Sequence, residues 1–279
     1  MDLQKVCFIC GAPHSGSTLL GLILGSHSKC FYAGEANKVT FLHSKSSSED
    51  SKCKMCGQNC SIWGDFTLKD PKDLYLQLSL KTQTPIIIDS TKKPTWLQEQ
   101  INNLKREQIT LTLIYLYRDG RAVINSRLRK YKDSEPAKVI DNWISHINKT
   151  NQLYNEFPGD KIKILYKNLA QNTIETIQTI TKFLTISFEP SMIAFYEHEH
   201  HPLGGNTGTQ SLILKSQQEK RINSPIQLSE RNQYYYEDHP LQIKFDERWK
   251  TELDPKVLHL FDKKAGALNT TFLDEFKKQ

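Results

Sequence analysis

Short apolar runs alternate with segments of helical period along the first two thirds of the chain. Four runs rich in β-branched and aromatic residues are predicted to be strands: Val6–Cys10, Pro85–Asp89, Leu111–Tyr117 and Ile162–Tyr166. Continuous runs of this kind are typical of strands that are covered on both faces, as in a parallel sheet. Residues 139–147 and 174–184 carry apolar side chains at i, i+3 and i+4 spacing, which predicts amphipathic helices. The alternation favours a doubly wound α/β fold.

Two segments interrupt this alternation, whereas no linker or repeat divides the chain. Residues 43–70 are polar and contain a serine run, so we expect an exposed insertion. Residues 198–239 are rich in Gly, Gln, Asn and Tyr and show no clear period. Long irregular segments of compact domains are often lids or binding loops. We therefore expect one domain over residues 1–279, with a polar insertion at about 43–70 and an irregular lid or binding segment at about 198–239.

The most informative segment follows the first predicted strand. It reads Gly11-Ala12-Pro13-His14-Ser15-Gly16-Ser17-Thr18 and leads into a leucine-rich stretch. A glycine loop between a strand and a helix directs backbone N–H groups and the helix N-terminus toward one point, which makes an anion site. The usual nucleotide loop has lysine where this chain has Ser17. The loop predicts a P-loop-type three-layer α/β/α fold with a central parallel sheet that binds a phosphate-like group, but not an ordinary Mg-nucleotide hydrolase.

A second candidate anion anchor follows the third predicted strand. Arg118 stands at the strand end, where open α/β sheets bind ligands, and Ser126 follows about two helical turns later. A guanidinium fork and a hydroxyl can together hold a phosphate, and Lys130 is a further candidate for the same contact. The plainer alternative is that Arg118 and Arg121 form surface ion pairs.

With both motifs in view, the chain resembles the sulfotransferases that use 3′-phosphoadenosine 5′-phosphosulfate (PAPS). In that family P-[KRH]-S-G-[ST]-T holds the 5′-phosphosulfate, and a later R-D-x-R-x-x-x-x-S holds the 3′-phosphate. This chain has Pro13–Thr18 and Arg118–Ser126 in the same order, and its R-D-G-R form resembles the tyrosylprotein branch and bacterial relatives. The resemblance covers about residues 5–184 and returns in part at 204–206 and 245–249.

The resemblance implies which residues hold the donor. The implied donor contacts, with Lys130 as an extension, are Pro13, His14, Ser15, Gly16, Ser17, Thr18, Arg118, Ser126 and Lys130. It also gives a reason for Ser17, because a sulfuryl donor needs neither a γ-phosphate cradle nor Mg²⁺. PAPS is therefore the expected co-substrate, and no metal is expected in the chemistry.

Sulfuryl transfer to an alcohol needs a base, positive charge at the leaving phosphate, and an acceptor oxygen in line with sulfur. Glu35 is the candidate base, because the tyrosylprotein-like enzymes carry G-E at the matching place. His14 stands where relatives use lysine or arginine, so it is a candidate donor to the leaving phosphate or, alternatively, the base itself. Lys92 follows the isoleucine strand, and the resemblance assigns its position to leaving-group stabilisation.

A cysteine cluster raises a separate question. Cys53, Cys56 and Cys60 form C-x2-C-x3-C, which fits a structural zinc site, a disulfide or free thiols. Three cysteines are one ligand short of a closed zinc site unless Cys30 or a histidine such as His43 completes it. Any such metal is expected to stabilise a loop and to take no part in the reaction.

Two further clusters lie in the segment 198–239. His198-Glu199-His200-His201 is not a recognised ligand set, so we expect an exposed turn or acceptor contacts there. Tyr234-Tyr235-Tyr236 either stacks on adenine or acceptor, or anchors its loop.

Composition constrains the class of protein, its partners and its location more than it constrains the reaction. Apolar residues make up 38% and charged residues 24%, as in a globular protein. The net charge of +6 suits an anionic ligand but does not argue for nucleic acid. No apolar window is long enough to cross a bilayer, and no signal peptide stands at the N-terminus. We therefore expect a cytoplasmic location, with no membrane span and no nucleic-acid partner.

The sequence thus predicts an enzyme, a PAPS-dependent sulfotransferase that moves a sulfuryl group to a hydroxyl acceptor. A small molecule or natural product is the expected acceptor, and a glycan, a lipid head group or a protein tyrosine is the alternative. A P-loop kinase would need lysine at position 17 and a Mg²⁺-binding carboxylate, for which Asp89 is the candidate. A non-catalytic binding protein on the same fold is the third interpretation. Acceptor identity and oligomeric state stay open.

Overall fold

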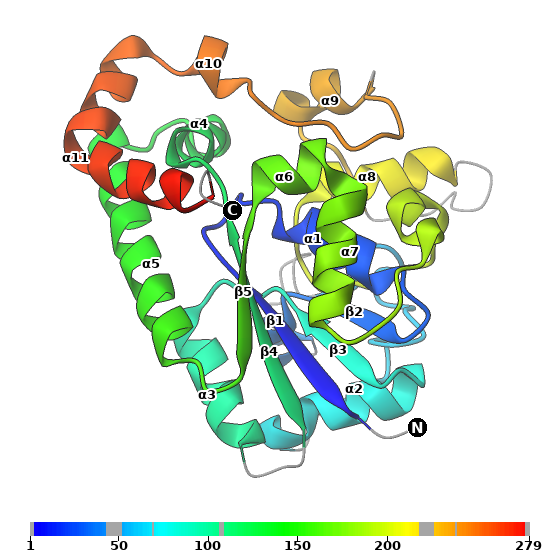
Figure 1. The fold of residues 1–279 in the computed structure, drawn as a ribbon. Helices are drawn as coiled ribbons and strands as arrows, with labels where there is room; N and C mark the ends of the chain where they lie inside the picture. Colours follow the sequence, from blue (N-terminus) through cyan, green and yellow to red (C-terminus); the bar gives the residue numbers. More distant parts are fainter. Residues whose placement is uncertain are drawn as a thin grey trace.

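A parallel sheet of five strands forms the centre of the molecule (Figure 1). The computed structural model describes residues 3–42, 52–68, 70–105, 109–217, 226–237 and 239–276. The strands run in the order β2-β3-β1-β4-β5. Their bounds are β1 Lys5–Cys10, β2 Cys30–Gly34, β3 Ile86–Asp89, β4 Thr110–Tyr117 and β5 Asp160–Leu165.

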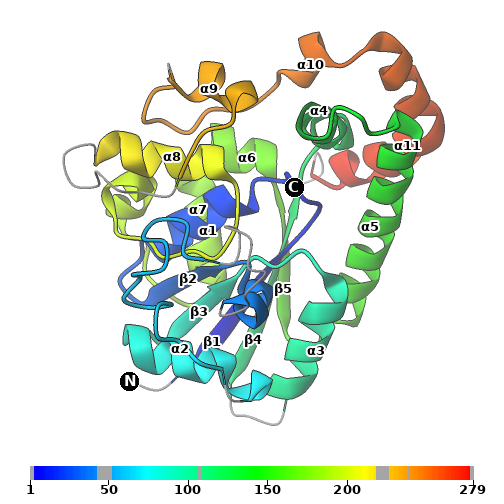
Figure 2. The same cartoon turned by 180° about the vertical axis from the view of Figure 1, so that it is seen from behind.

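Helices cover both faces of this sheet. Figure 1 shows α6 and α7 in front of it, and Figure 2, from behind, shows α2 and α3. The α-helices are α1 Ser17–Gly25, α2 Leu74–Thr82, α3 Pro94–Leu104, α4 Gly120–Lys130, α5 Pro136–Glu156, α6 Tyr166–Gln171, α7 Thr173–Phe183, α8 Thr207–Ser216, α9 Glu230–Glu237, α10 Trp249–Glu252 and α11 Pro255–Glu275. The 3₁₀ helices are η1 Ala36–Phe41, η3 Pro71–Asp73 and η4 Pro190–Glu197. The predicted three-layer α/β/α fold with a central parallel sheet is confirmed.

The apolar runs become strands because both of their faces are buried. In β1 the residues from Val6 to Cys10 are at most 2% exposed, and β1 pairs with β3 on one side and β4 on the other. Lys5 stands opposite Ile86 and Thr110 in this register. Strands covered on two faces cannot alternate apolar and polar residues, which is why their sequences read as continuous apolar runs.

The carboxyl edge of the sheet is the natural place for a ligand. The chain leaves β1 toward α1 and β2 on one side, and leaves β4 toward α4 and β5 on the other. Ligands of open α/β sheets bind in the crevice that such diverging connections create. In Figure 1 the helices α4, α8, α9 and α10 gather at this end of the sheet.

The four predicted strands are found within two residues of their expected bounds, except that Tyr166 begins α6. The expected irregular segment 198–239 is wrong in part, because it contains α8 and α9. Helix α8 forms despite its polar sequence, since the Asn206 side chain accepts the Thr209 N–H at 2.8 Å and Leu212 and Ile213 are buried.

The expected exposed insertion at 43–70 is also wrong in part over its described residues, because buried apolar side chains alternate there with exposed polar ones. Five apolar side chains in residues 52–68 are buried in the core: Cys53, Met55, Cys60, Trp63 and Phe66. Trp63 packs edge-on against Phe66, with ring centroids 5.2 Å apart. None of the helices in the described ranges has the length and apolarity needed to cross a membrane.

Candidate active site

The phosphate loop connects β1 to α1 through left-handed backbone. Gly11, His14 and Gly16 all have positive φ, of 142°, 70° and 99°. A side chain at Gly16 would meet the Tyr166 ring at 2.6 Å, so glycine is required there for space as well as for conformation. The loop therefore presents His14 at the carboxyl edge of the sheet.

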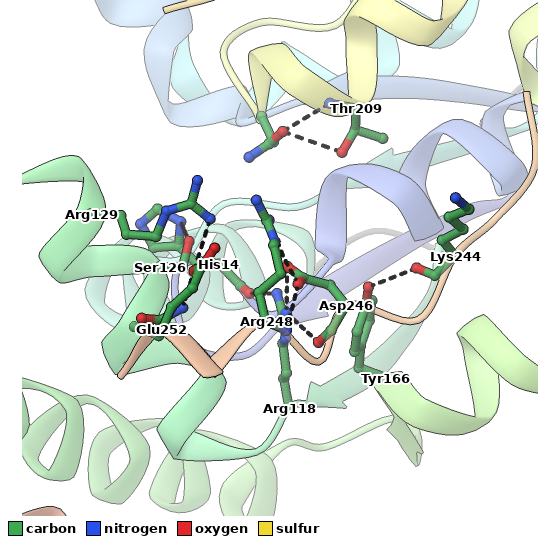
Figure 3. Close-up of polar contacts among 12 residues, drawn as sticks. His14, Arg118, Ser126, Arg129, Tyr166, Thr209, Lys244, Asp246, Arg248 and Glu252 are labelled. Atoms are coloured by element: carbon green, nitrogen blue, oxygen red, sulfur yellow. Dashed lines mark hydrogen bonds and ion pairs between the residues drawn. The ribbon is translucent and has the colours of Figure 1, made fainter. Parts of the chain in front are cut away.

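The two sequence motifs meet at His14 (Figure 3). Arg118, directly after β4, donates from Nη1 to the backbone oxygen of His14 at 3.0 Å. Ser126, on α4, places Oγ 3.0 Å from Nδ1 of the His14 ring. Ser126 thus faces the loop, and the two candidate anion anchors are in direct contact at His14.

Arg118 is not a surface residue. Its Nη2 donates to the Asp246 carboxylate at 3.0 Å, and its guanidinium lies over the Tyr166 ring, 4.5 Å from the centroid. Arg248 binds the same carboxylate through Nε and Nη2, both at 2.8 Å. Burial opposes ionisation of Asp246, but the hydrogen bonds and charges of Arg248 and Arg118 outweigh it and hold its pKa below the ordinary value. Arg118 Nε and Arg248 Nη1 are buried and have no hydrogen-bond partner among the described residues.

The surface ion-pair alternative holds for Arg121 instead. Arg121 binds Asp119 through Nε and Nη2 at 2.9 and 2.6 Å and lies over the Trp249 ring at 4.2 Å. The contact with Trp249 joins α4 to α10.

Glu35 stands across the carboxyl edge from α4, just after β2. Its Oε1 lies 3.0 Å from Nζ of Lys92, and its Oε2 lies 3.2 Å from Nζ of Lys38. Burial of Glu35 favours the neutral acid, but the charges and hydrogen bonds of Lys92 and Lys38 outweigh burial and lower its pKa to about 2. The candidate base and the candidate leaving-group lysine are thus in direct contact, and Glu35 is ionised at neutral pH.

Backbone pairing holds Glu35 in place. Leu203, just before α8, donates its N–H to the oxygen of Ala33 at 3.0 Å and accepts the Glu35 N–H at 2.7 Å. Gly34 has a φ of 81°, and a Cβ there would overlap the backbone of Leu203. The segment before α8 therefore forms a short extension of the sheet beside β2, and this extension positions the carboxylate.

A cavity of about 930 Å³ joins these groups. Its walls include eight of the donor residues that the sequence predicts and both other catalytic candidates: Pro13, His14, Gly16, Ser17, Thr18, Arg118, Ser126 and Lys130, with Glu35 and Lys92. Pockets for single drug-sized ligands span about 300–1,000 Å³, so this cavity lies at the upper end of that range. The basic side chains on α4 and around Glu35 make it suitable for an anion with several charges.

Ser15 is the predicted donor residue that does not line this cavity. Its side chain is fully buried behind the loop, and its Oγ has no hydrogen-bond partner among the described residues. Its N–H donates to the Ala12 oxygen at 3.1 Å, which tightens the turn. Thr18 lines the cavity, but its Oγ1 accepts the Asn206 N–H at 2.9 Å. The structure thus gives Thr18 a contact that joins α1 to the start of α8.

Several cavity residues were not predicted. Lys38, His146 and Arg248 all line it, and the Arg248 guanidinium lies 3.8 Å from the ring centroid of Tyr235, which belongs to the predicted tyrosine run. His146, on α5, places Nε2 3.1 Å from the Gly11 oxygen, and burial lowers its pKa. The signal for Arg248 was the likeness at residues 245–249, whereas nothing in the helical pattern around His146 distinguishes it from a surface residue.

Asp89 cannot serve as the Mg²⁺ ligand that a kinase would need. It is fully buried and accepts hydrogen bonds from Tyr75, Thr91, Ala36 and Trp96 at 2.7–3.3 Å. Its carboxylate ties the end of β3 to the turn after β2 and does not line the cavity. The P-loop kinase interpretation therefore loses its candidate carboxylate as well as the lysine at position 17.

The expected exposed turn at 198–201 is wrong for two of its residues. His200 and His201 are buried, because His200 binds the Phe195 oxygen at 2.8 Å and His201 packs against the cysteine cluster. Of the fourth ligands considered from the sequence, Cys30 lies in β2 outside that cluster. His43 lies outside the described residues.

The tyrosine run is divided between two roles. Tyr235 and Tyr236 line the cavity, and Tyr236 packs against Gly208 of α8. Tyr234 is 87% exposed and does not line it. These positions support both the stacking and the anchoring interpretations, at different residues.

Comparisons with known proteins find chains of similar sequence and similar fold. A relative from Caenorhabditis briggsae with the provisional name protein-tyrosine sulfotransferase is 23% identical over 226 residues, which are 78% of each chain. The sulfotransferase domain from the curacin biosynthetic pathway has the same fold, with a TM-score of 0.63, 17% identity, and coverage of 95% of this chain and 99% of that domain. A mouse sulfotransferase solved with PAP has a TM-score of 0.50 at 12% identity, with coverage of 97% and 90%.

The family model of the sulfotransferases matches residues 7–190, which include the phosphate loop, Glu35, Lys92 and the Arg118 motif. This match spans well over half of the chain, and the fold and the recognised relatives point the same way. The chain therefore belongs to the sulfotransferase family.

Proposed function

We propose that the protein transfers the sulfuryl group of PAPS to a hydroxyl group of a small-molecule acceptor. The observation that carries the proposal is the junction of the phosphate loop with Arg118 and Ser126 at His14, in a cavity that also holds a Glu35–Lys92 pair. A doubly phosphorylated donor suits this basic wall, because charge-assisted hydrogen bonds to phosphate are the strong ones. PAP, which the mouse relative binds, is such a molecule without its sulfuryl group.

In this proposal Arg118, Arg248 and Ser126 bind the 3′-phosphate, and the loop from Pro13 to Thr18 binds the phosphosulfate end. Lys92 contacts the phosphate oxygen that becomes the leaving group, where negative charge collects as the S–O bond breaks. Glu35 accepts the acceptor's proton as the new S–O bond forms. The products are PAP and a sulfate ester.

The Glu35–Lys92 contact couples these two roles. A carboxylate with a pKa of about 2 is ionised but weakly basic, since the best general bases have a pKa near the operating pH. When Lys92 turns to the leaving phosphate, Glu35 loses its nearest positive charge and becomes more basic. His14 is the alternative base, and its ring is oriented by Ser126.

A small acceptor is favoured by the apolar part of the cavity. Phe41, Phe195 and Leu212 line it together with the polar donor site. Protein-tyrosine sulfation is the second candidate, because the Caenorhabditis briggsae relative carries that name.

The test is a transfer assay with PAPS labelled in the sulfuryl group. Simple phenols, aliphatic alcohols, an acidic tyrosine peptide and a small-molecule extract serve as acceptors, and mass spectrometry detects the sulfate-sized increment. We expect PAP release that depends on a small hydroxyl acceptor. Transfer to the peptide alone would replace the small-molecule acceptor by protein tyrosine. If none of the acceptors causes PAP release, the chain is a non-catalytic binding protein and the proposal is overturned.

A further inference from the structure

Three cysteines and one histidine from distant parts of the chain form a compact cluster. The ligand atoms of Cys53, Cys56, Cys60 and His201 all lie within 4.8 Å of one another. The three thiols are free. Nδ1 of His201 lies 3.4 Å from Sγ of Cys56 and 3.3 Å from Sγ of Cys60. His201 is therefore the fourth group that the C-x2-C-x3-C motif lacked.

These separations are those of a tetrahedral zinc site. Zinc binds thiolate sulfur at about 2.3 Å and histidine nitrogen at about 2.0–2.1 Å, so sulfur and nitrogen ligands of one ion lie about 3.5 Å apart. A Cys₃His set is a closed structural set, and a soft thiolate-rich site selects zinc over magnesium or calcium. A disulfide, in contrast, would use two of the cysteines and leave the third beside the histidine.

The surrounding residues orient the cluster. The Gly57 N–H donates to the Cys53 oxygen at 2.9 Å, and Gly57 has a φ of 68°, which closes the turn that carries the first two thiols. Oε1 of Glu199 lies 3.2 Å from Nε2 of His201. A carboxylate is the usual outer partner of a zinc-bound histidine. With Glu199 at Nε2, Nδ1 of His201 is left as the metal-binding nitrogen.

We propose that Cys53, Cys56, Cys60 and His201 bind one structural Zn²⁺ ion. The site lies apart from the proposed reaction, because none of these four residues lines the described cavity. Cys53 and Cys60 are at most 3% exposed, so a bound ion would be closed off from substrate.

The position of the cluster explains what the ion would do. Leu203, two residues after His201, bridges to both Gly34 and Cys53 and hydrogen-bonds the backbone of Glu35. Asn206, a little further on, binds Thr18 at the start of α1. The ion thus clamps the segment that positions the proposed base, a role that rests on the proposed function, whereas the metal site itself does not.

The experiment measures metal in the purified, reduced full-length chain by mass spectrometry of the elements. We expect one zinc per chain, and loss of more than nine tenths of it in Cys60→Ser and in His201→Ala. Cys30→Ala and His198→Ala are the matched controls, since both residues lie outside the cluster, and both should keep the full zinc content. Wild-type protein without zinc, zinc retained in Cys60→Ser, or a disulfide among the three cysteines would each overturn the proposal.

A second measurement keeps the test valid if the variants do not fold. A mercurial reagent added to the wild-type chain should release zinc in step with modification of the cluster cysteines, as located by peptide mapping. Release unrelated to these cysteines would overturn the site. Both measurements proceed without turnover, so an inactive protein that holds zinc would contradict only the proposed function. An active protein without zinc would contradict only the metal site.

Discussion

Glu35 is the residue whose environment makes the most specific demands on the chemistry. Lys92 and Lys38 keep it ionised although it is only 23% exposed. As the proposed base, Glu35 contributes to the rate of proton transfer and makes no contact with the phosphates of PAPS. Loss of its carboxylate should therefore slow the reaction without weakening PAPS binding.

Substitution of Glu35 by glutamine tests this role. We expect Glu35→Gln to lower kcat by about 100-fold or more, the usual contribution of general base catalysis, with little change in KM for PAPS. The matched control is Glu135→Gln, which makes the same change in an exposed residue at the start of α5. Initial rates at saturating PAPS measure both. If Glu35→Gln turned over as fast as the control, the base would be another group, and His14 would be the next candidate.

Lys92 is expected to act on rate more than on binding. Its charge contacts Glu35 in this structure and is needed at the leaving phosphate only as the S–O bond breaks. Lys92→Ala should therefore lower kcat strongly while the dissociation constant for PAP changes little. Turnover rates and calorimetric binding of PAP, compared with Lys93→Ala at the neighbouring cavity position, separate the two effects. An equal loss of PAP affinity and kcat would instead make Lys92 a ground-state binding residue.

The same ion pair predicts a pH dependence of stability. The pKa of Glu35 falls from an ordinary 4.5 to about 2 in the folded protein. A lowered folded-state pKa contributes stability that is complete above the unfolded value and is lost as pH falls through the folded one. The difference in unfolding free energy between wild type and Glu35→Gln should thus be constant above pH 4.5 and shrink between pH 4.5 and 2. Urea unfolding at a series of pH values measures it, and a difference that does not shrink would refute the ion pair.

At the scale of elements, the pairing of β2 with the segment before α8 decides where the carboxylate stands. Gly34 is the point of closest approach, with a positive φ and no space for a Cβ beside Leu203. We expect Gly34→Ala to lower stability by about 2 kcal/mol or more, since strained left-handed backbone alone costs about 1–3 kcal/mol. We also expect it to lower kcat, because Glu35 follows directly.

Gly266 provides the matched control for that change. It lies in α11 with its nearest neighbour atom 3.8 Å from the position of an added Cβ. Gly266→Ala should raise stability by about 0.5–1 kcal/mol, because alanine is the better helix former. Thermal unfolding of both variants checks the pair. A Gly34→Ala protein as stable as wild type would contradict the close backbone contact with Leu203.

Local sequence patterns predicted well those elements whose structure depends on residues close in sequence. The apolar runs gave four strands, and the loop and the R-D-G-R motif gave one wall of the cavity, because both lie directly after strands. Contacts across long sequence separations were out of reach. His201 reaches Cys60 over 141 residues and Arg118 reaches Asp246 over 128, and no local spacing records such pairs. Helix α8 was missed because its apolar side chains are few and its cap is a single asparagine.

At the scale of the whole molecule, one sheet edge collects every group that the proposed reaction needs. The carboxyl ends of β1 and β4 supply the donor wall, and those of β2 and β3 supply Glu35 and Lys92. Since the strands are parallel, all four ends lie at the same edge. The fold therefore brings the proposed donor site and the proposed base to one edge of the sheet.

The most direct test of the donor site compares PAP with 5′-AMP by calorimetry, in EDTA and without Mg²⁺. The two ligands differ by the 3′-phosphate, and a charge-assisted hydrogen bond contributes about 1.5–3 kcal/mol, which is about 10–100-fold in affinity. We expect PAP to bind one per chain and at least about tenfold tighter than AMP. Arg118→Lys keeps the positive charge but loses the guanidinium fork, so it should lower the ratio of PAP affinity to AMP affinity. Equal affinity for PAP and AMP, or binding only of Mg-ATP, would contradict a PAPS site.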